Sequence, residues 1–266
     1  MSSIGLGIIT CNREDFYKEC YESVPLDMVD ELVTINDGNP YKFNSSEKFI
    51  QHESNKGVGV SKNEAMRYLL NKGCEHIFLI EDDIIITDKS VFEKYITTAK
   101  TTGVYHLMYG YHGPANKSPK SKEGVPSPRL IVEYSTDCSI ALNEHCVGAF
   151  CYYHKDTLDE VGLMDETYVN AWEHVDHSYQ LVKADVVPGY WWWPDVADSY
   201  KYLDEQACSE DSSAIRPRSD WKHNIQKGAM YFISKNGHSP VDIPDQSSQQ
   251  ITETLKRIKK NNKTNA

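Results

Sequence analysis

The first part of the chain alternates short apolar runs with segments whose apolar residues recur at helical spacing. Residues 4–10 (IGLGIIT) and 31–37 (ELVTIND) are apolar runs that stop at polar turn residues, which is typical of buried strands. The apolar positions between them predict a helix: Phe16, Tyr17, Cys20 and Tyr21. A strand over 77–80 and a helix from about Ser90 continue the alternation. This order predicts an α/β fold with a mostly parallel sheet covered on both faces.

Residues 60–73 (VSKNEAMRYLLNKG) predict a capped helix between the second and third of these strands. Ser61 and Glu64 have the spacing of a capping box, and Gly73 would stop the helix. Its inward face consists of four apolar residues: Ala65, Met66, Leu69 and Leu70. Ligands of parallel α/β sheets bind at the carboxyl ends of the strands, so we expect the functional residues there.

The second half of the chain is less regular. Its strand-like and helix-like stretches are 129–134, 138–142, 147–153 and 175–184, and its expected loops are 112–128 and 203–220. In the tail, Ile251, Leu255 and Ile258 share a helical face among many lysines.

Three acids interrupt the apolar stretch IFLIEDDIII at residues 77–86. An isolated carboxylate taken out of water is costly unless it is paired or bound to a cation. Mg²⁺ and Mn²⁺ prefer such oxygen ligands and share their shell with a ligand's phosphates. We therefore expect Asp83 to bind a metal directly, with Glu81 and Asp82 contacting nucleotide or water. An acidic turn solvated at the end of a strand is the alternative.

Composition narrows the class of protein. The chain has 266 residues, 39% of them hydrophobic, which suits one large α/β domain. A net charge of −11 argues against a general electrostatic grip on nucleic acid or anionic membrane. Seven cysteines without a CxxC pair, no secretory signal pattern and no long apolar run predict a cytoplasmic protein without a transmembrane segment.

Several loops share the expected sheet edge with these acids. They are TCNR (10–13), NDGNP (36–40), NKGVGVSKN (55–63) and LIEDD (79–83). Each is common alone, and the GxG is not the dinucleotide fingerprint GxGxxG, which argues against a dehydrogenase. In this order, followed by residues 147–181 (VGAFCYYHKDTLDEVGLMDETYVNAWEHVDHSYQL), they resemble the inverting family 2 glycosyltransferases and their GT-A relatives over roughly residues 4–181.

The resemblance implies a metal-dependent enzyme with a GT-A fold. It would move a sugar from a nucleotide-diphosphate donor, expected to be a UDP-sugar, to a hydroxyl acceptor with the help of Mn²⁺ or Mg²⁺. Residues 1–245 would form one domain, with 1–110 as the nucleotide-binding half and 111–245 as the acceptor-binding half. Residues 246–266 would form a basic C-terminal helix.

The resemblance also implies a set of ligand-binding residues. Those beside the donor are Thr10, Asn12, Arg13, Asp37, Lys62, Asn63, Glu81 and Asp82. Asp37 matches the acid that reads the uracil ring, and Lys62 stands where the family usually has arginine. Asp83 matches the metal-binding acid of the DxD-type motif. His223 of DWKHN is the counterpart of a later metal-proximal histidine.

An inverting transfer needs a general base for the acceptor hydroxyl. The segment WEHVDH (172–177) offers Glu173, His174 and Asp176 before an expected helix. The family usually has Glu-Asp where this chain has Glu173-His174, so we expect Glu173 to be the base, with Asp176 and His174 as equal alternatives. Aromatic rings pack against sugars, and the expected acceptor contacts are Trp172, Trp192 and Trp221.

The sequence does not identify the acceptor. A glycan or glycolipid precursor is the default for the family, and a hydroxylated base of viral or phage DNA is an alternative. The basic tail could make weak contact with a membrane or nucleic acid, aided in the latter case by the lysine-rich loop 117–122. Two other classes remain. A nucleotidyltransferase would need a G-x-G-x-R pattern that GLGIITCNR does not provide, and a binding module without a catalytic base would explain His174.

Overall fold

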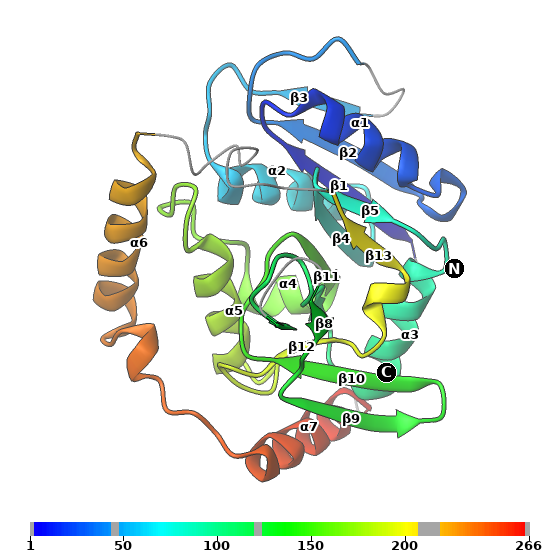
Figure 1. The fold of residues 1–266 in the computed structure, drawn as a ribbon, viewed down its shortest axis with the longest axis vertical. Coiled ribbons are helices and arrows are strands. Elements are labelled where there is room, and N and C mark those ends of the chain that lie inside the picture. Colours follow the sequence, from blue (N-terminus) through cyan, green and yellow to red (C-terminus); the bar gives the residue numbers. More distant parts are fainter. Residues whose placement is uncertain (1–2, 44–47, 120–123, 207–218, 264–266) are drawn as a thin grey trace.

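A six-stranded sheet forms the centre of the protein (Figure 1). The computed structural model describes residues 3–43, 48–119, 124–206 and 219–263. The strands, in spatial order, are β3 (Lys48–Gln51), β2 (Glu31–Asn36), β1 (Ile4–Thr10), β4 (His76–Glu81), β11 (Phe150–His154) and β6 (His106–Met108). Strand β11 is antiparallel to both of its neighbours, β4 and β6. The four strands β3, β2, β1 and β4 are parallel to one another. The prediction of a mostly parallel sheet is confirmed.

Helices and three small sheets complete the fold. The helices are α1 (Glu14–Ser23), α2 (Val58–Asn71), α3 (Val91–Thr102), α4 (Lys155–Val161), α5 (Glu173–Lys183), α6 (Trp221–Asn236) and α7 (Ser248–Lys263). The small sheets pair β9 (Leu130–Ser135), β10 (Cys138–Asn143) and β12 (Trp193–Val196); β5 (Ile84–Ile86) and β13 (Leu203–Glu205); and β7 (Lys117–Ser118) and β8 (Val125–Pro126). Short 3-10 turns lie at Leu26–Met28, Ser199–Lys201 and Pro240–Asp242.

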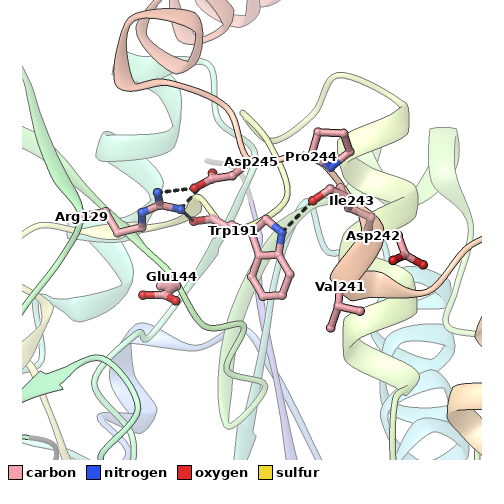
Figure 2. A pocket seen from close by; sticks show the side chains of 8 residues that line it. All are labelled: Arg129, Glu144, Trp191, Val241, Asp242, Ile243, Pro244 and Asp245. Carbon is pink, nitrogen blue, oxygen red and sulfur yellow. Dashed lines mark hydrogen bonds and ion pairs between the residues drawn. The ribbon is translucent and has the colours of Figure 1, made fainter.

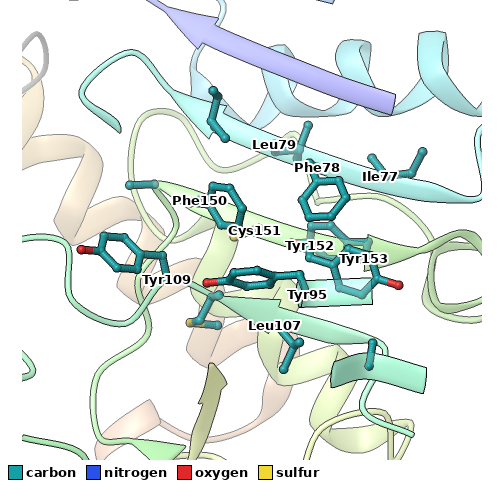
Figure 3. Close-up of a cluster of buried hydrophobic side chains, with 14 of the residues drawn as sticks. Ile77, Phe78, Leu79, Tyr95, Leu107, Tyr109, Phe150, Cys151, Tyr152 and Tyr153 are labelled. Atoms are coloured by element: carbon teal, nitrogen blue, oxygen red, sulfur yellow. The ribbon is translucent and has the colours of Figure 1, made fainter. Parts of the chain in front are cut away.

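Aromatic side chains form a buried cluster where β4 and β11 pair (Figure 3). The ring of Phe78 on β4 lies 5.0 Å from that of Tyr152 and 5.9 Å from that of Phe150, both on β11. Phe92 and Tyr95 of α3 pack onto the same cluster. Both faces of β4 are covered, which is why its sequence is an unbroken apolar run up to Glu81.

Helix α2 begins earlier than its capping-box pattern predicts. It starts at Val58, after Gly57 with a φ of 100°, and Ser61 lies inside the first turn, where its hydroxyl donates to the Gly57 carbonyl at 3.0 Å. The prediction of Ser61 as N-cap was therefore wrong. The entry is set by Asp37, whose carboxylate accepts the backbone N–H groups of Lys56 and Gly57 and so turns the chain into the helix sooner.

The tail packs against the body of the protein. The predicted apolar face of Ile251, Leu255 and Ile258 is buried, and α7 contacts α3. Gly103, at the end of α3, has a φ of 79°, and a Cβ there would lie 3.0 Å from the Lys259 backbone. No helix in the described part of the chain is both long and apolar enough to span a bilayer. The predicted loops 203–220 and 117–122 fall partly outside the described residues.

Candidate active site

Two of the three predicted acids are buried at the carboxyl edge of the sheet. β4 ends at Glu81, and Asp82 and Asp83 form the turn into β5. Arg13 forms ion pairs with both, with 3.2 Å between its Nη1 and Asp83 Oδ2. The Thr10 hydroxyl donates to Asp82 Oδ2 at 2.7 Å. Burial raises the pKa of Asp82, against the pull of Arg13 and with a contribution from Asp83.

His112 and Glu205 join this acidic turn from the second half of the chain. His112 Nε2 lies 3.4 Å from Asp83 Oδ1 and 3.7 Å from Glu205 Oε2. β13 pairs with β5 so that Glu205 stands opposite Ile84, next to Asp83. Burial opposes the charge of His112, but Asp83 and then Glu205 outweigh it and raise its pKa. Sequence reasoning missed both residues because they lie in regions where no periodic pattern fixes their position.

The predicted metal-proximal histidine has a different environment. His223 is exposed on the first turn of α6, which Figure 1 draws at the edge of the molecule, apart from β4. Among the described residues, no group of three or more acidic, histidine or cysteine side chains is arranged to hold a metal ion. His112, and not His223, is thus the imidazole that the structure places beside Asp83.

Asp37 organises the loop that leads into α2. Its buried carboxylate accepts hydrogen bonds from the backbone of Lys56 and Gly57 at 2.7 and 2.8 Å and from Asn55 Nδ2 at 2.7 Å. His52 Nδ1 lies 2.6 Å from the same carboxylate. Each oxygen therefore has two partners within the protein, so a base-reading role would require Asp37 to share or exchange one of them.

Two of the residues predicted to lie beside the nucleotide-sugar form hydrogen bonds with the main chain of nearby loops. Asn12, with a φ of 57°, accepts a hydrogen bond from the backbone of Asn39 at 2.7 Å. Gly38 is required beside it, because a Cβ there would lie 2.5 Å from Asn12 Oδ1. Asn63 is buried and holds the main chain of Met164 through both of its side-chain polar atoms. Both asparagines position loops around the edge of the sheet.

Lys62, Glu81 and Glu173 form a second charged cluster. The buried Lys62 ammonium donates to Glu81 Oε1 at 2.7 Å and to the Gly148 carbonyl at 2.9 Å. Burial disfavours its charge, but the carboxylates of Glu81 and Glu173 outweigh burial and raise the pKa of Lys62. Gly59 allows α2 to approach α5, since a Cβ there would lie 3.0 Å from the Cβ of Glu173.

Glu173 has one buried oxygen that the described residues leave without a hydrogen-bond partner, its Oε2. Glu173 is the first residue of α5, and its Oε1 lies 2.9 Å from His174 Nδ1. Burial favours its neutral form, but His174 and Lys62 prevail and lower the pKa of Glu173 to about 2. The side chain is therefore a carboxylate at neutral pH, with one oxygen able to accept a proton.

Asp176 is placed to anchor α6. Its Oδ2 accepts from the Lys235 ammonium at 2.7 Å, and its Oδ1 from Asn236 Nδ2 at 3.3 Å. The same lysine also bonds Asp165 at 2.8 Å. These partners account for the buried charge of Asp176 without a catalytic role, so the geometry favours Glu173 and its neighbour His174 among the three predicted bases.

The three predicted acceptor tryptophans have different surroundings. Trp172 fits against α6, where a Cβ on Gly228 would lie 2.6 Å from its ring. Trp221, the first residue of α6, is partly buried. Trp192 is buried, donates from its indole N–H to Asp245 at 2.9 Å, and lies 3.9 Å below the guanidinium of Arg129. Its ring is therefore covered by this chain's own side chains.

Comparison with known proteins agrees with this architecture. No protein-family model matches the chain. It is 27% identical over 179 residues to an uncharacterized glycosyltransferase of Acanthamoeba polyphaga mimivirus, a match that covers 65% of this chain and 63% of that protein. The match thus spans less than two thirds of the relative's length.

Solved structures resemble the chain more extensively. Glucosyl-3-phosphoglycerate synthase from Mycobacterium tuberculosis, in complex with Mn²⁺, UDP and phosphoglyceric acid, superposes with a TM-score of 0.51 and 13% identity, over 92% of this chain and 80% of that one. GalNAc-T7, crystallised with UDP, GalNAc and Mn²⁺, superposes with a TM-score of 0.55 and 12% identity, over 99% of this chain and 55% of the GalNAc-T7 chain. The chain therefore has the GT-A fold of glycosyltransferases.

Proposed function

We propose that the chain is a metal-dependent glycosyltransferase that moves a sugar from a UDP-sugar to a hydroxyl acceptor with inversion. The observation that carries this proposal is the pair of buried carboxylates, Asp82 and Asp83, at the carboxyl edge of a GT-A sheet. Both face Arg13, a side chain long enough to rearrange when a ligand enters, and Asp83 also faces the imidazole of His112. The UDP and Mn²⁺ bound by the similar structures support this choice of ligands.

The residues around Asp83 suit a divalent cation. Carboxylate oxygens of Asp83 and Glu205 and the imidazole of His112 are ligands that Mn²⁺ accepts, and the carboxylates suit Mg²⁺ as well. Asp83 and His112 would hold the ion, and the nucleotide's phosphates and water would complete its shell. When bound, such an ion supplies positive charge that stabilises the departing nucleoside diphosphate.

The protein's own cations would act on the same diphosphate. Arg13 carries two hydrogen-bond donors that already reach the acidic turn, so a small shift would present them to a phosphate oxygen. Lys62 is held in place by Glu81 and the Gly148 carbonyl, so its charge lies between the acidic turn and the start of α5. It stabilises both the Glu81 carboxylate and the ionised form of Glu173.

Glu173 is the proposed base. Its Oε2 has no hydrogen-bond partner among the residues that the structure describes, and it would take the proton of the acceptor hydroxyl as that hydroxyl oxygen attacks the anomeric carbon. His174, bonded to the other oxygen, would orient the carboxylate. The bond from the anomeric carbon to the diphosphate breaks on the opposite side, which inverts the configuration. We propose a glycan or glycolipid precursor as the acceptor.

A panel of nucleotide-sugars tests the proposal. Thermal unfolding would be followed with UDP-, GDP-, dTDP- and CMP-sugars, each with Mn²⁺ and with a chelator. A ligand that binds the native state raises the Tm, so a UDP-sugar should do so in Mn²⁺ and lose its effect with chelator. Slow release of UDP and free sugar should accompany binding. Pyrophosphate release would instead indicate nucleotidyl transfer, and binding without any release would indicate a binding module.

A further inference from the structure

A cavity separate from the acidic turn lies where the segment between α6 and α7 crosses the small β9–β10–β12 sheet (Figure 2). Its volume is about 510 Å³, within the range of small-molecule sites. Eight residues line it: Arg129, Glu144, Trp191, Val241, Asp242, Ile243, Pro244 and Asp245. None of them belongs to the predicted donor or catalytic residues.

Trp191 presents its ring to this cavity in a fixed orientation. Its indole N–H donates to the Ile243 carbonyl at 3.2 Å, and its backbone has a φ of 69°, a conformation unfavourable for a bulky residue. Figure 2 shows the ring standing between Glu144 on one side and Val241 on the other. The hydrogen bond and the backbone together hold an aromatic face toward the open space.

The opposite wall is built and charge-neutral. Arg129 pairs with Asp245 through both terminal nitrogens, at 3.1 and 2.6 Å, and also donates to the Trp191 carbonyl at 3.0 Å. Its guanidinium is thereby committed to these partners. The acceptors left for a ligand are the exposed carboxylate of Glu144 and the second oxygen of Asp242, whose Oδ2 accepts the Ser239 backbone N–H at 3.2 Å. With one cation and three acids, the lining disfavours anionic ligands such as phosphates.

An aromatic face next to carboxylates matches a neutral saccharide. The C–H side of a sugar ring packs on an indole, and its hydroxyls donate to carboxylates. We propose that this cavity binds a sugar unit of an extended acceptor glycan, remote from the unit that receives the transferred sugar. This inference rests on the proposed function, because the bound glycan is an acceptor only if the chain is a glycosyltransferase.

The cavity lies at a suitable distance from the base. Glu144 is followed after four residues by Gly148, whose carbonyl bonds Lys62 and whose Cβ would touch His174 at 3.1 Å. Four residues span at most about 14 Å. The intervening Cys146 lies beside α5, with its sulfur 3.5 Å from the Ser178 hydroxyl, so the segment follows the helix from the cavity toward Glu173. A short oligosaccharide can cover this distance.

Oligosaccharide binding without donor or metal tests the inference. Saturation-transfer NMR and calorimetry would use hexasaccharides of glucose in α-1,4 and β-1,4 linkage, of mannose, and of N-acetylglucosamine. At least one should bind the wild type, Trp191→Ala should weaken it at least tenfold, and Glu144→Gln several-fold. Glu133→Gln, an exposed acid on β9 outside the cavity, is the matched control and should bind normally.

The outcomes separate this inference from the proposed function. Failure of every hexasaccharide to bind, or unchanged binding by Glu144→Gln and Trp191→Ala, would overturn the sugar site. Glu144→Gln keeps the test decisive if Trp191→Ala does not fold, because Glu144 is exposed. Mn²⁺-dependent binding of UDP is measured on the same wild-type sample. Its loss would overturn the donor proposal and would leave the result for the cavity standing.

Discussion

Two buried acidic regions of this protein differ in the partners of their carboxylates. Asp82 and Asp83 at the sheet edge face the guanidinium of Arg13, and Asp83 also faces the imidazole of His112. Asp195 on β12 is also buried, and burial raises its pKa to about 7. Its partners are neutral: the hydroxyls of Tyr95 and Ser199 at 2.7 and 2.5 Å, and backbone N–H groups at 2.7 and 3.0 Å.

The difference separates a binding site from a structural joint. Asp195 ties α3, β12 and the loop after β6 together through main-chain N–H groups and the buried hydroxyls of Tyr95 and Ser199. Arg13 reaches its acids through a long side chain that an incoming ligand can displace, and His112 lies beside Asp83 at the same edge. A buried acid alone therefore does not identify a functional site, whereas replaceable cationic partners favour one.

The largest expected effect is at Glu173, a further buried carboxylate, one oxygen of which has no hydrogen-bond partner among the described residues. Replacing it with glutamine removes the proton acceptor but keeps the shape of the side chain. We expect turnover to fall by roughly 10²–10⁴-fold with little change in donor affinity. Steady-state kinetics beside Mn²⁺-dependent UDP binding would check this. Undiminished turnover would move the base to another residue.

Asp83→Asn should show whether Asp83 serves ligand binding or, like Asp195, the stability of the fold. If Asp83 holds the metal as proposed, loss of its carboxylate should weaken Mn²⁺-dependent UDP binding on the order of a hundred-fold or more, while the Tm without ligands changes little. Calorimetric titration of UDP with Mn²⁺ and with chelator measures the effect. A large fall in ligand-free Tm with intact UDP binding would instead make Asp83 a structural residue like Asp195.

Glu173 also predicts a pH dependence of stability. Its folded pKa of about 2 lies below the ordinary value of 4.5, so it contributes stability above about pH 4.5 that is lost as the pH falls toward 2. The contribution is at most about 3 kcal/mol. Urea unfolding should show that the wild type has a higher free energy of unfolding than Glu173→Gln at pH 6, and that this difference becomes smaller as the pH is lowered. A difference independent of pH would contradict the lowered pKa.

Asp195→Asn should show the smallest effect and only on stability. The amide cannot accept from all four donors of the carboxylate, so we expect a loss of about 2 kcal/mol in the free energy of unfolding. Mn²⁺-dependent UDP binding should remain as in the wild type, measured on the folded variant. Loss of UDP binding at unchanged stability would remove the distinction between the two acidic regions.

Much of the N-terminal part followed from local patterns. β1 lies at residues 4–10 as expected, and the apolar runs before Asp37 and Glu81 form the strands on either side of it, because both are buried on two faces and stop at polar residues. The acidic turn could be placed at a sheet edge for the same reason. The position of each side chain within that edge could not, since Asp37 turned inward to hold the loop before α2.

The rest depended on contacts between distant residues. Glu205 lies beside Asp83 because β13 pairs with β5, a pairing across more than a hundred residues that no local periodicity predicts. His112 reaches both acids from the loop after β6. Asp176 and Glu173 look alike in sequence, and only the packing of α6 shows that one of them is bonded to Lys235. The roles assigned to the predicted donor, metal and acceptor residues stay predictions.

Strand β11 has a consequence for how the protein is made. It fills the place between β4 and β6, although it follows them by some forty residues or more in the chain. Until residue 154 has left the ribosome, β4 and β6 each present an open, hydrogen-bonding edge. Cutting the gene near residue 110 should therefore yield an N-terminal fragment that aggregates, and supplying the missing piece as a separate polypeptide should rescue its solubility.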